Sequence, residues 1–510
     1  MNSRTNLKGA KSITPNYQYR ANNKISNLFI GANNDTKYLS ICANYDTMYT
    51  RNLGGVLMER NAMRELVRWN EKKRRKPLVV WGARQVGKTY LIQELFAETY
   101  YKGNYIYIDF KKEDEIRAFC AQTANAEKII EYISLRQSKK ITEKTLLIFD
   151  EVQECPNIVS SLKYFCQDYP QIPVIATGSM VRIKIQRETH KRGASEGNKF
   201  LFPVGKIDQL TIYPMTFDEF LLNNNQVLYD TVQKAYENKE PLAPDIHELA
   251  MEYVYRYLLI GGMPEAVATY IDEEDAFESR EVLKVLYDNY LSDMDLYQAS
   301  KEAILRSRAL FTNIYRELNK ESKNFSPGLI EENSKTRDYA SAIQWLTMAH
   351  IVNQSFQLKE HITTPLMADN ESYFRLFLGD IGMFSYQSGI NAASFVSSER
   401  ENTLSGIFFE NFVANELIAK GHKLFYWKGK ASAELEFIVE SANKLYPIDV
   451  KKRKGTLNSL EKFANHNRFA TAIKVSKNNF GYNAEQKLLT IPFYFFSFVA
   501  KDLADGTLPY

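Results

Sequence analysis

Three apolar runs stand out in the first half of the chain. They lie at residues 78–81 (LVVW), 146–149 (LLIF) and 172–180 (IPVIATGSM), the last ending in polar residues. Apolar runs of this length, without polar alternation, are typical of parallel strands covered on both faces. After the first run, apolar side chains recur at helical spacing: Leu91, Ile92, Leu95 and Phe96. The pattern predicts an α/β domain built on a parallel sheet.

The next region, residues 206–300, has the pattern of helices. The segment MEYVYRYLLIGGMPEAVATYI carries apolar residues at helical spacing, interrupted by Gly261, Gly262 and Pro264. Glycine and proline break helices because one is too free and the other lacks an N–H donor. A helical segment next to such a sheet predicts a lid over a ligand bound at the sheet edge.

Residues 301–390 have the pattern of a helix, a turn, a second helix and two strands. This order predicts a winged-helix region, a module that can lay its second helix in a DNA major groove. The expected second helix, TRDYASAIQWLTMAH, offers a single arginine, Arg337, beside Asp338. One arginine is a poor match for a phosphate backbone, so we favour a protein contact or a structural role over DNA binding.

The last region, residues 391–510, contains two segments that alternate as half-buried strands. In AELEFIVE, Glu436 faces away from its apolar neighbours. In YPIDVKK, Asp449 and Lys451 share one face, because side chains two residues apart point the same way. We therefore expect an α/β domain with charged residues gathered on one side of its sheet.

The start of the chain differs from the rest. Residues 1–57 are rich in Asn, Ser, Thr and Tyr and show no sustained periodicity, so we expect a disordered extension, with Met58 as an alternative start. The predicted parts are the extension (1–57), a core built on the parallel sheet (58–205), a helical lid (206–300), a winged-helix-like region (301–390) and a C-terminal α/β domain (391–510).

Composition narrows the class of protein. The 510 residues are 45% hydrophobic and 25% charged, with a net charge of +4 that is too small to imply nucleic acid by itself. Four cysteines show no C-x-x-C spacing, so no zinc site or disulfide framework is indicated. The start has no apolar core of a signal peptide, and the apolar stretch near residue 495 is broken by Pro492. We expect a cytoplasmic protein that does not enter a membrane.

The segment GARQVGKT, after the first predicted strand, fits the pattern G-x-x-x-x-G-K-[ST] between a strand and a helix, which is the context of a P-loop. Its glycines let successive N–H groups point at an anion, and the helix N-terminus adds partial positive charge. Lys88 is expected to reach the β and γ phosphates and Thr89 to ligate Mg²⁺. The loop residues expected to bind ATP are Gly82, Ala83, Arg84, Gln85, Val86, Gly87, Lys88 and Thr89.

The second run ends in two carboxylates, Asp150 and Glu151. A parallel strand delivers them to the carboxyl edge of the sheet, where open α/β sheets bind ligands. Asp150 is expected to hold Mg²⁺, and Glu151 to polarise the attacking water as a general base. The third run ends in Thr177 and Ser179, of which Ser179 is expected to sense the γ-phosphate; an ordinary strand-end cap is an equally good reading.

The guanine-reading motif of GTPases, [NT]-K-x-D, has its nearest match in GKID at residues 205–208, which has the wrong first residue. Taken together, these segments resemble the AAA-type ATPases of bacteria and archaea. GARQVGKT, LLIFDE and ATGS carry the resemblance to the group. FLFPVGKIDQLTIYPMTFDEFL, YLLIGGMPEAV, FRLFLGDIGMFSY, FFENFVANEL and YPIDVKK resemble one branch, which has an uncharacterised C-terminal domain. The resemblance runs from Met58 to near the end of the chain, and it implies ATP binding and hydrolysis.

The C-terminal carboxylates resemble the arrangement of PD-(D/E)xK nucleases. There, two carboxylates hold Mg²⁺ and the lysine activates water or stabilises charge at phosphorus. The site expected from this resemblance is Glu410, Glu436, Asp449 and Lys451. The family usually has Asp where this chain has Glu436, and Glu where it has Asp449. A nuclease-like fold without cleavage is the alternative.

The sequence as a whole predicts an ATPase, with ATP and Mg²⁺ as cofactors, that drives or gates a C-terminal module contacting DNA or a protein partner. Two alternatives stay open. One is an ATP-switched DNA-binding or scaffold protein with little turnover, and the other is an ATP-regulated, Mg²⁺-dependent nuclease. Oligomeric state is left open as well.

Overall fold

A computed structural model describes residues 58–178, 202–298, 300–390, 406–430, 433–451 and 458–510. Residues 56–510 group into one compact unit by their contacts. The predicted extension at 1–57 and the candidate residue Ser179 lie outside the described residues.

The first sheet is parallel throughout, with the strand order β2-β3-β4-β1-β5. The three apolar runs are its central strands β1, β3 and β4, as predicted. β5 pairs with β1, so the sheet extends past residue 205, where the sequence pattern ended the core. The strands are β1 (Leu78–Trp81), β2 (Tyr105–Asp109), β3 (Leu146–Asp150), β4 (Val174–Thr177) and β5 (Asp208–Thr211).

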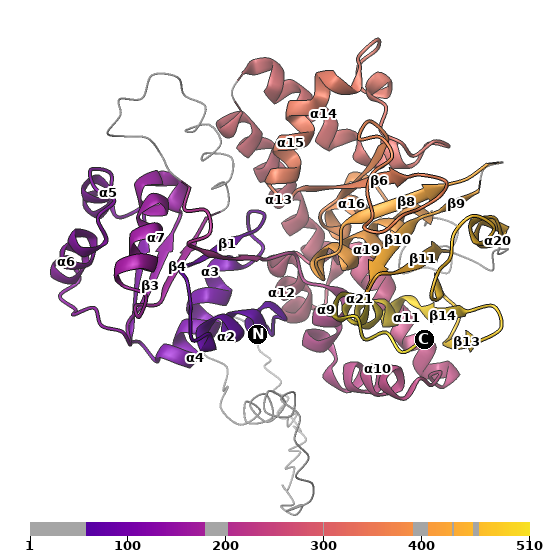
Figure 1. Cartoon of the computed structure of the whole chain (residues 1–510), viewed down its shortest axis with the longest axis horizontal. Helices are drawn as coiled ribbons and strands as arrows, with labels where there is room; N and C mark the ends of the chain where they lie inside the picture. The colour runs from indigo at the N-terminus through magenta and orange to yellow at the C-terminus, as the bar shows by residue number, and fades with distance from the viewer. Residues whose placement is uncertain (1–57, 179–201, 299, 391–405, 431–432, 452–457) are drawn as a thin grey trace, which may run out of the picture. The chain divides into compact units, whose positions relative to one another are not determined.

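Both faces of this sheet are covered, as its apolar strands require. On β1, Leu78 and Val80 belong to one hydrophobic cluster, and Val79 and Trp81 belong to another. The first cluster includes side chains of α2 and the helix after the P-loop, and the second includes side chains of α5, α6 and α7 (Figure 1). The helices are α2 (Ala62–Glu71), α5 (Asp114–Cys120), α6 (Ala126–Arg136) and α7 (Pro156–Asp168).

The helix after the P-loop differs from the α-helix that its spacing predicts. A short α3 (Lys88–Tyr90) leads into a π-helix at Leu91–Ala97, followed by α4 (Glu98–Tyr101). The fully buried residues of the π-helix are Leu91, Ile92, Phe96 and Ala97. Buried positions five residues apart favour the wider π-turn, because i→i+5 hydrogen bonds bring such positions onto one face.

In the region predicted to be helical, residues 206–300, the described residues after β5 form mainly helices, and the glycine pair breaks the helices where expected. α11 ends at Gly261, which has φ +77°, and Pro264 is the first residue of α12. A Cβ on Gly262 would lie 2.0 Å from the Met215 carbonyl oxygen, so only glycine fits there. The helices are α9 (Phe217–Asn224), α10 (Gln226–Asn238), α11 (Pro244–Ile260), α12 (Pro264–Glu273), α13 (Ala276–Tyr297) and α14 (Lys301–Leu318).

Residues 301–390 show the predicted order of helix, helix, strand, strand. They comprise α14, α15 (Ala340–Met348), β6 (Val352–Leu358) and β7 (Phe374–Leu378), followed by α16 (Ile381–Gln387). The two strands are not a separate wing, because β6 also pairs in parallel with β8 (Leu424–Lys428) from the C-terminal region. The resulting sheet has the order β7-β6-β8-β9, with β9 at Glu434–Leu435.

The C-terminal region is an α/β arrangement around a mixed sheet of order β10-β11-β12-β14-β13. The predicted continuous strand at 433–440 is interrupted at Glu436, where the chain leaves one sheet (β9) and enters the other (β10). The elements are α19 (Gly406–Ala419), β10 (Phe437–Ser441), β11 (Lys444–Val450), α20 (Asn458–Ala464), β12 (Ala472–Ser476), β13 (Gly481–Asn483), β14 (Leu488–Pro492) and α21 (Phe496–Asp505).

One hydrophobic cluster extends from Met58 to Leu503 and includes buried residues of the first sheet, the helical segment and α19. Among the described residues, no helix is both long and apolar enough to cross a bilayer.

A buried carboxylate in this core generates a pH prediction. Glu416 on α19 accepts hydrogen bonds from the Phe217 N–H (2.8 Å) and the Ser497 hydroxyl (2.6 Å). Burial, and then the nearby Asp218 carboxylate, raises the pKa of Glu416 to about 7. Because the folded chain holds this proton when the unfolded chain does not, stability is lost as pH rises from about 4.5 to about 7.

Glu416→Gln should weaken that loss, since the amide keeps an acceptor and a donor but does not titrate. Urea unfolding at a series of pH values measures the free energy of unfolding. The value for the variant should rise relative to that of the wild type by up to roughly 1 kcal/mol per pH unit across this window. Glu485→Gln, at an exposed position, is the control. Parallel pH profiles for wild type and Glu416→Gln would show that Glu416 is not the titrating group.

Candidate functional site

The P-loop lies between β1 and α3 and curls as its glycines suggest. Gly82 has φ +145° and Gly87 has φ +81°, and a Cβ on Gly82 would lie 2.3 Å from the Ile212 carbonyl oxygen. The ammonium group of Lys88 donates to the carbonyl oxygens of Gly82 (3.2 Å) and Ala83 (2.7 Å). The loop therefore has the positive-φ glycines and the buried cation that suit a phosphate cradle.

The predicted Mg²⁺ ligands are in contact. The Thr89 hydroxyl donates to Asp150 Oδ2 at 2.8 Å, at the carboxyl end of β3. A hydroxyl and a carboxylate side by side are the hard oxygen ligands that Mg²⁺ takes beside phosphate and water. These two residues would hold the ion, and the structure brings them together as the sequence suggested.

Two further side chains at this edge were missed by the sequence analysis. The Tyr107 hydroxyl donates to Asp150 Oδ2 (2.8 Å), and Asp109, buried at the end of β2, lies opposite Asp150 in the strand register. Burial, and then Asp150, raises the pKa of Tyr107, so its hydroxyl stays a donor. The signal was available in YIYID, where Tyr107 and Asp109 share a strand face.

Glu151 follows β3 in a left-handed conformation, with φ +52°. It accepts a hydrogen bond from the Gln153 amide, and its own N–H donates to Asp150 Oδ1 at 2.8 Å. Burial, and then the Asp150 carboxylate, raises the pKa of Glu151. A carboxylate with a raised pKa accepts a proton more readily, which suits a general base.

Lys88 is the other titratable group of the loop. Burial lowers its pKa to about 8, although Glu151 and Asp150 act to raise it. The remaining candidate at the sheet edge, Thr177, donates its hydroxyl to the Val80 carbonyl oxygen (3.4 Å) inside the sheet.

The P-loop also contacts the helical segment. Arg84 forms an ion pair with Asp293, whose side chain is 1% exposed, and the Tyr290 hydroxyl donates to the Arg84 carbonyl oxygen at 3.1 Å. Both partners lie on α13. The predicted lid therefore touches the loop through this helix.

Arg60, just before α2, binds a backbone carbonyl of the P-loop. Its Nη1 donates to the Val86 carbonyl oxygen (3.0 Å), its Nη2 to the Tyr213 carbonyl oxygen (2.8 Å), and its Nε pairs with Glu219 (3.2 Å). The Arg60 side chain is 2% exposed. A long-range contact of this kind leaves no pattern in the sequence.

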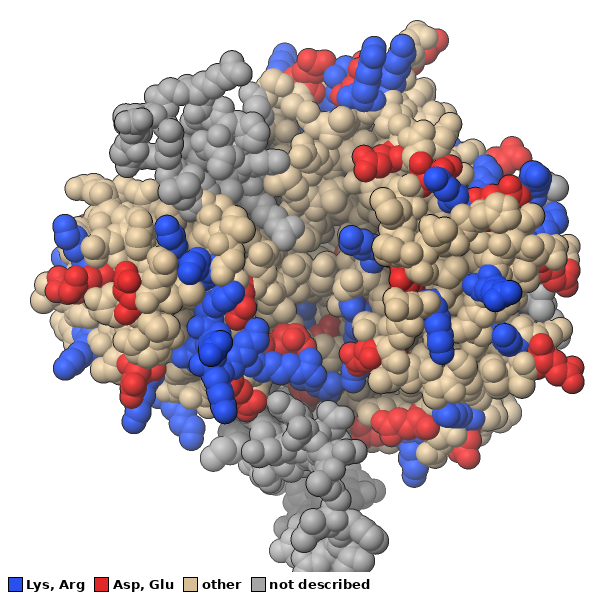
Figure 2. Space-filling model, in the orientation of Figure 1, with Lys and Arg blue, Asp and Glu red and all other residues tan. Residues whose placement is uncertain are grey.

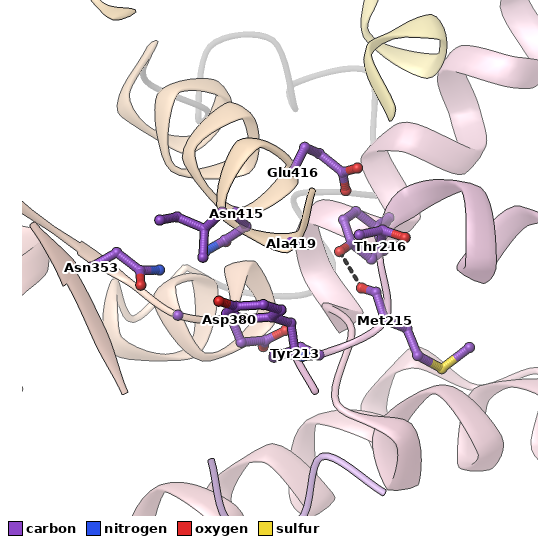
Figure 3. A pocket seen from close by; sticks show the side chains of 12 residues that line it. Tyr213, Met215, Thr216, Asn353, Asp380, Asn415, Glu416 and Ala419 are labelled. Carbon is purple, nitrogen blue, oxygen red and sulfur yellow. Dashed lines mark hydrogen bonds between the residues drawn. The ribbon is translucent and has the colours of Figure 1, made fainter. Parts of the chain in front are cut away.

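The contacts continue from Glu219 toward the C-terminal region. Glu219 closes the capping box of α9 with Thr216, and its neighbour Asp218 pairs with Lys420 at 3.4 Å. A small cavity of about 10 Å³ lies next to these contacts. Thr216, Asp380 and Glu416 are among the residues that line it (Figure 3). The cavity has room for about one water molecule and is not a ligand pocket.

The C-terminal candidates also meet. Glu410 lies on α19, Glu436 at the bend before β10, and Asp449 on β11, with Lys451 just after it. Lys451 lies 2.6 Å from Asp449 and 3.6 Å from Glu436, and the Val450 N–H donates to Glu436 at 3.0 Å. Strand alternation predicted the shared face of Asp449 and Lys451, and the resemblance to PD-(D/E)xK nucleases predicted that Glu410 and Glu436 join them.

Glu436 and Lys451 shift each other's pKa. Burial raises the pKa of Glu436 to about 8, opposed by Lys451. For Lys451 itself, burial favours a lower pKa, but Glu436 and Asp449 outweigh it and raise the pKa. Within the described ranges, no three His, Cys, Asp or Glu residues are arranged to hold a metal ion.

Comparisons with known proteins support the predicted P-loop domain in the first part of the chain. Residues 74–221 match the model of an AAA domain. Residues 251–394 and 405–496 match two domains of unknown function, DUF8612 and DUF4143. No curated protein matches the chain. The chain thus contains an AAA-type P-loop domain, and the nuclease-like reading of the C-terminal region is not confirmed by its match.

Two solved structures have a limited likeness to the chain. The Walker-type ATPase PABY2304 of Pyrococcus abyssi is 13% identical, with a TM-score of 0.38, over 66% of this chain and 99% of that one. The replication initiator DnaA bound to AMPPCP and single-stranded DNA is 14% identical, with a TM-score of 0.25, over 57% and 88%. Similarity at this level carries no functional conclusion.

The position of Arg60 generates a prediction for nucleotide affinity. Arg60→Lys keeps the charge but loses the fork that joins Val86, Tyr213 and Glu219. The P-loop backbone should become less well ordered, and the Kd for ATP measured by calorimetry should rise several-fold. Arg64→Lys, two positions into α2 and exposed, is the matched control. If the two variants bind ATP with equal affinity, Arg60 does not contribute to nucleotide binding.

Proposed function

We propose that the chain binds ATP with Mg²⁺ at the P-loop and hydrolyses it, with Glu151 as the general base. The contact between Thr89 and Asp150, 2.8 Å long and next to Glu151, carries the proposal. It supports a Mg²⁺–nucleotide site with a base beside it, as the AAA domain match at 74–221 suggests.

The chain's own groups have separate roles in this scheme. The loop N–H groups and Lys88 bind the phosphates, and Thr89 and Asp150 hold the ion. A bound Mg²⁺ would supply positive charge that offsets the negative charge developing on the phosphate oxygens. Glu151 takes the proton of the water that attacks the γ-phosphorus. Tyr107 orients the Asp150 carboxylate through its hydrogen bond.

We propose further that the nucleotide state is relayed to the C-terminal half, which contacts a partner. The contacts from Val86 through Arg60 and Glu219 to α9, and from α9 through Asp218 to Lys420 on the turn after α19, support such a relay. Buried, mutually paired charges shift together, because leaving one unpaired is costly.

A protein partner fits this half better than DNA does. Arg337, on the turn before α15, lies 3.9 Å from Asp338 and is the one Lys or Arg of the helix expected to enter DNA. On the face shown in Figure 2, basic side chains gather in the region where Figure 1 draws α2.

Of the alternatives, the metal-dependent nuclease is the less well supported, because its carboxylates are ion-paired.

Lys88→Ala tests the nucleotide site. The variant loses a charge-assisted contact to phosphate, of roughly 1.5–3 kcal/mol, so its Kd for ATP should rise by about ten- to a hundredfold. Isothermal titration calorimetry measures this directly, and Lys111→Ala, at an exposed position after β2, is the control. Unchanged affinity in Lys88→Ala would contradict the site.

Glu151→Gln separates binding from turnover. The amide keeps the side-chain shape but cannot take a proton from water, so phosphate release should fall by about 10²–10⁴-fold. ATP affinity should stay within a few-fold of the wild type. Glu154→Gln, three residues further on, is the matched control. Wild-type turnover in Glu151→Gln would assign the base to another group, and the absence of turnover in the wild type would favour a nucleotide switch.

A further inference from the structure

Arg84 of the P-loop is held by α13 through both its side chain and its backbone. Its guanidinium group forms an ion pair with Asp293, and the Tyr290 hydroxyl donates to its carbonyl oxygen at 3.1 Å. Arg84 and Asp293 are 209 positions apart, and both partners on α13 lie in the segment that matches DUF8612. A residue of the nucleotide loop therefore contacts a helix that lies outside the match to an AAA domain.

The two side chains of this ion pair differ in their surroundings. That of Asp293 is 1% exposed, and its Oδ2 atom is buried with no hydrogen-bond partner among the described residues. That of Arg84 is 40% exposed. Burial raises the pKa of Asp293, and Arg84, ahead of Lys111, opposes this rise. The carboxylate is thus buried and dependent on Arg84, whereas the guanidinium group is open to solvent.

Arg84 also acts on the lysine that is expected to bind phosphate. Lys88 donates to the carbonyl oxygens of Gly82 and Ala83, the two residues directly before Arg84. Burial is the main cause that lowers the pKa of Lys88, and the positive charge of Arg84 contributes in the same direction. The guanidinium group is therefore within electrostatic reach of the phosphate-binding end of the loop. A guanidinium group binds phosphate oxygens through two parallel N–H donors, so Arg84 has the chemistry to bind ATP.

We propose that Arg84 exchanges partners: it pairs with Asp293 in the nucleotide-free chain and binds the phosphates of ATP when ATP is present. The exchange leaves Asp293 buried without its cation, which is costly and weakens the contact between α13 and the P-loop. ATP therefore competes with α13 for the same residue. This inference rests on the proposed binding of ATP at the P-loop and names the residue through which that binding is sensed.

A change at Asp293 acts on a part of α13 that also holds α14. Arg308 of α14 pairs with Asp295 at 2.8 Å and donates to the Leu291 carbonyl oxygen at 3.2 Å. These two residues of α13 lie two positions on either side of Asp293. Loosening of this part of α13 would reach α14 without passing through α9.

The test is a double-mutant cycle on the full chain with Mg²⁺, in which isothermal titration calorimetry measures the Kd for ATP. Asp293→Asn removes the competing charge and leaves Arg84 to the phosphates, so the Kd should fall by about three- to tenfold. Arg84→Gln loses the phosphate contact, so the Kd should rise by about tenfold. In the Arg84→Gln background, Asp293→Asn should change the Kd by less than about twofold. A purely structural role for the pair predicts that Asp293→Asn weakens binding instead.

Asp288→Asn is the matched control, because it removes the same charge from an exposed position on α13 and should leave the Kd unchanged. Thermal melts show whether each variant folds. Hydrogen–deuterium exchange gives a second measurement that needs no Asp293 variant. A saturating non-hydrolysable ATP analogue should speed the exchange of α13 amides in the wild type and not in Arg84→Gln.

Two kinds of result would overturn this inference and leave the proposed ATP site standing. One is a folded Asp293→Asn that binds ATP no more tightly than the wild type, or whose gain persists in Arg84→Gln, because Asp293 then does not act by holding Arg84. The other is exchange in α13 that the analogue does not speed, and this result counts even if Asp293→Asn fails to fold. A wild type that binds no ATP would overturn both the proposed function and this inference.

Discussion

The fold depends on the compensation of charge that is buried between segments far apart in sequence. Arg60 and Glu219 pair at 3.2 Å with side chains 2% and 6% exposed, and this pair ties the P-loop to the first turn of α9. Breaking such a pair from one side costs about 3–5 kcal/mol, because the remaining charge stays buried. The same requirement recurs where Lys420 meets Asp218 and where Lys323 meets Glu410. Each of these contacts joins parts of the chain that local patterns treat as separate.

Much of the first sheet could be predicted from the sequence, because its information is local. A P-loop needs a glycine turn, a strand before it and a helix after it, all within GARQVGKT and its flanks. Asp150 and Glu151 could be placed because a parallel strand has one carboxyl end. The edge strand β5 was not predicted, because its sequence DQLT is polar and lacks an apolar run. The π-helix was not predicted either, because the spacing of apolar residues alone does not distinguish i→i+4 from i→i+5 hydrogen bonding.

The partners of the site residues could not be predicted, for a physical reason. Arg60, Asp293 and Lys323 act through contacts with residues more than 25 positions away in sequence, and a single chain gives no measure of such distances. The C-terminal carboxylates lie between these cases. Strand alternation and the resemblance to PD-(D/E)xK nucleases together predicted that Glu436, Asp449 and Lys451 would gather. Neither predicted that Lys323 would pair with Glu410 and Glu434, or that Arg375 would pair with Glu434. The sequence thus identified the acids and one of their counter-ions, Lys451, and missed Lys323 and Arg375.

The hydrophobic cluster that runs from Met58 to Leu503 bears on how the chain can be divided. The match to an AAA domain ends at residue 221, yet Phe217 and Phe220 on α9 pack their rings near Tyr257 of α11, and Phe217 also lies near Phe412 of α19. A fragment cut at that boundary would expose these aromatic rings to water and would be prone to aggregate. The limits of sequence families and the limits of autonomous folding therefore differ in this protein. Separating the ATPase part for biochemistry would call for redesigned surface residues on α9 rather than for a simple truncation.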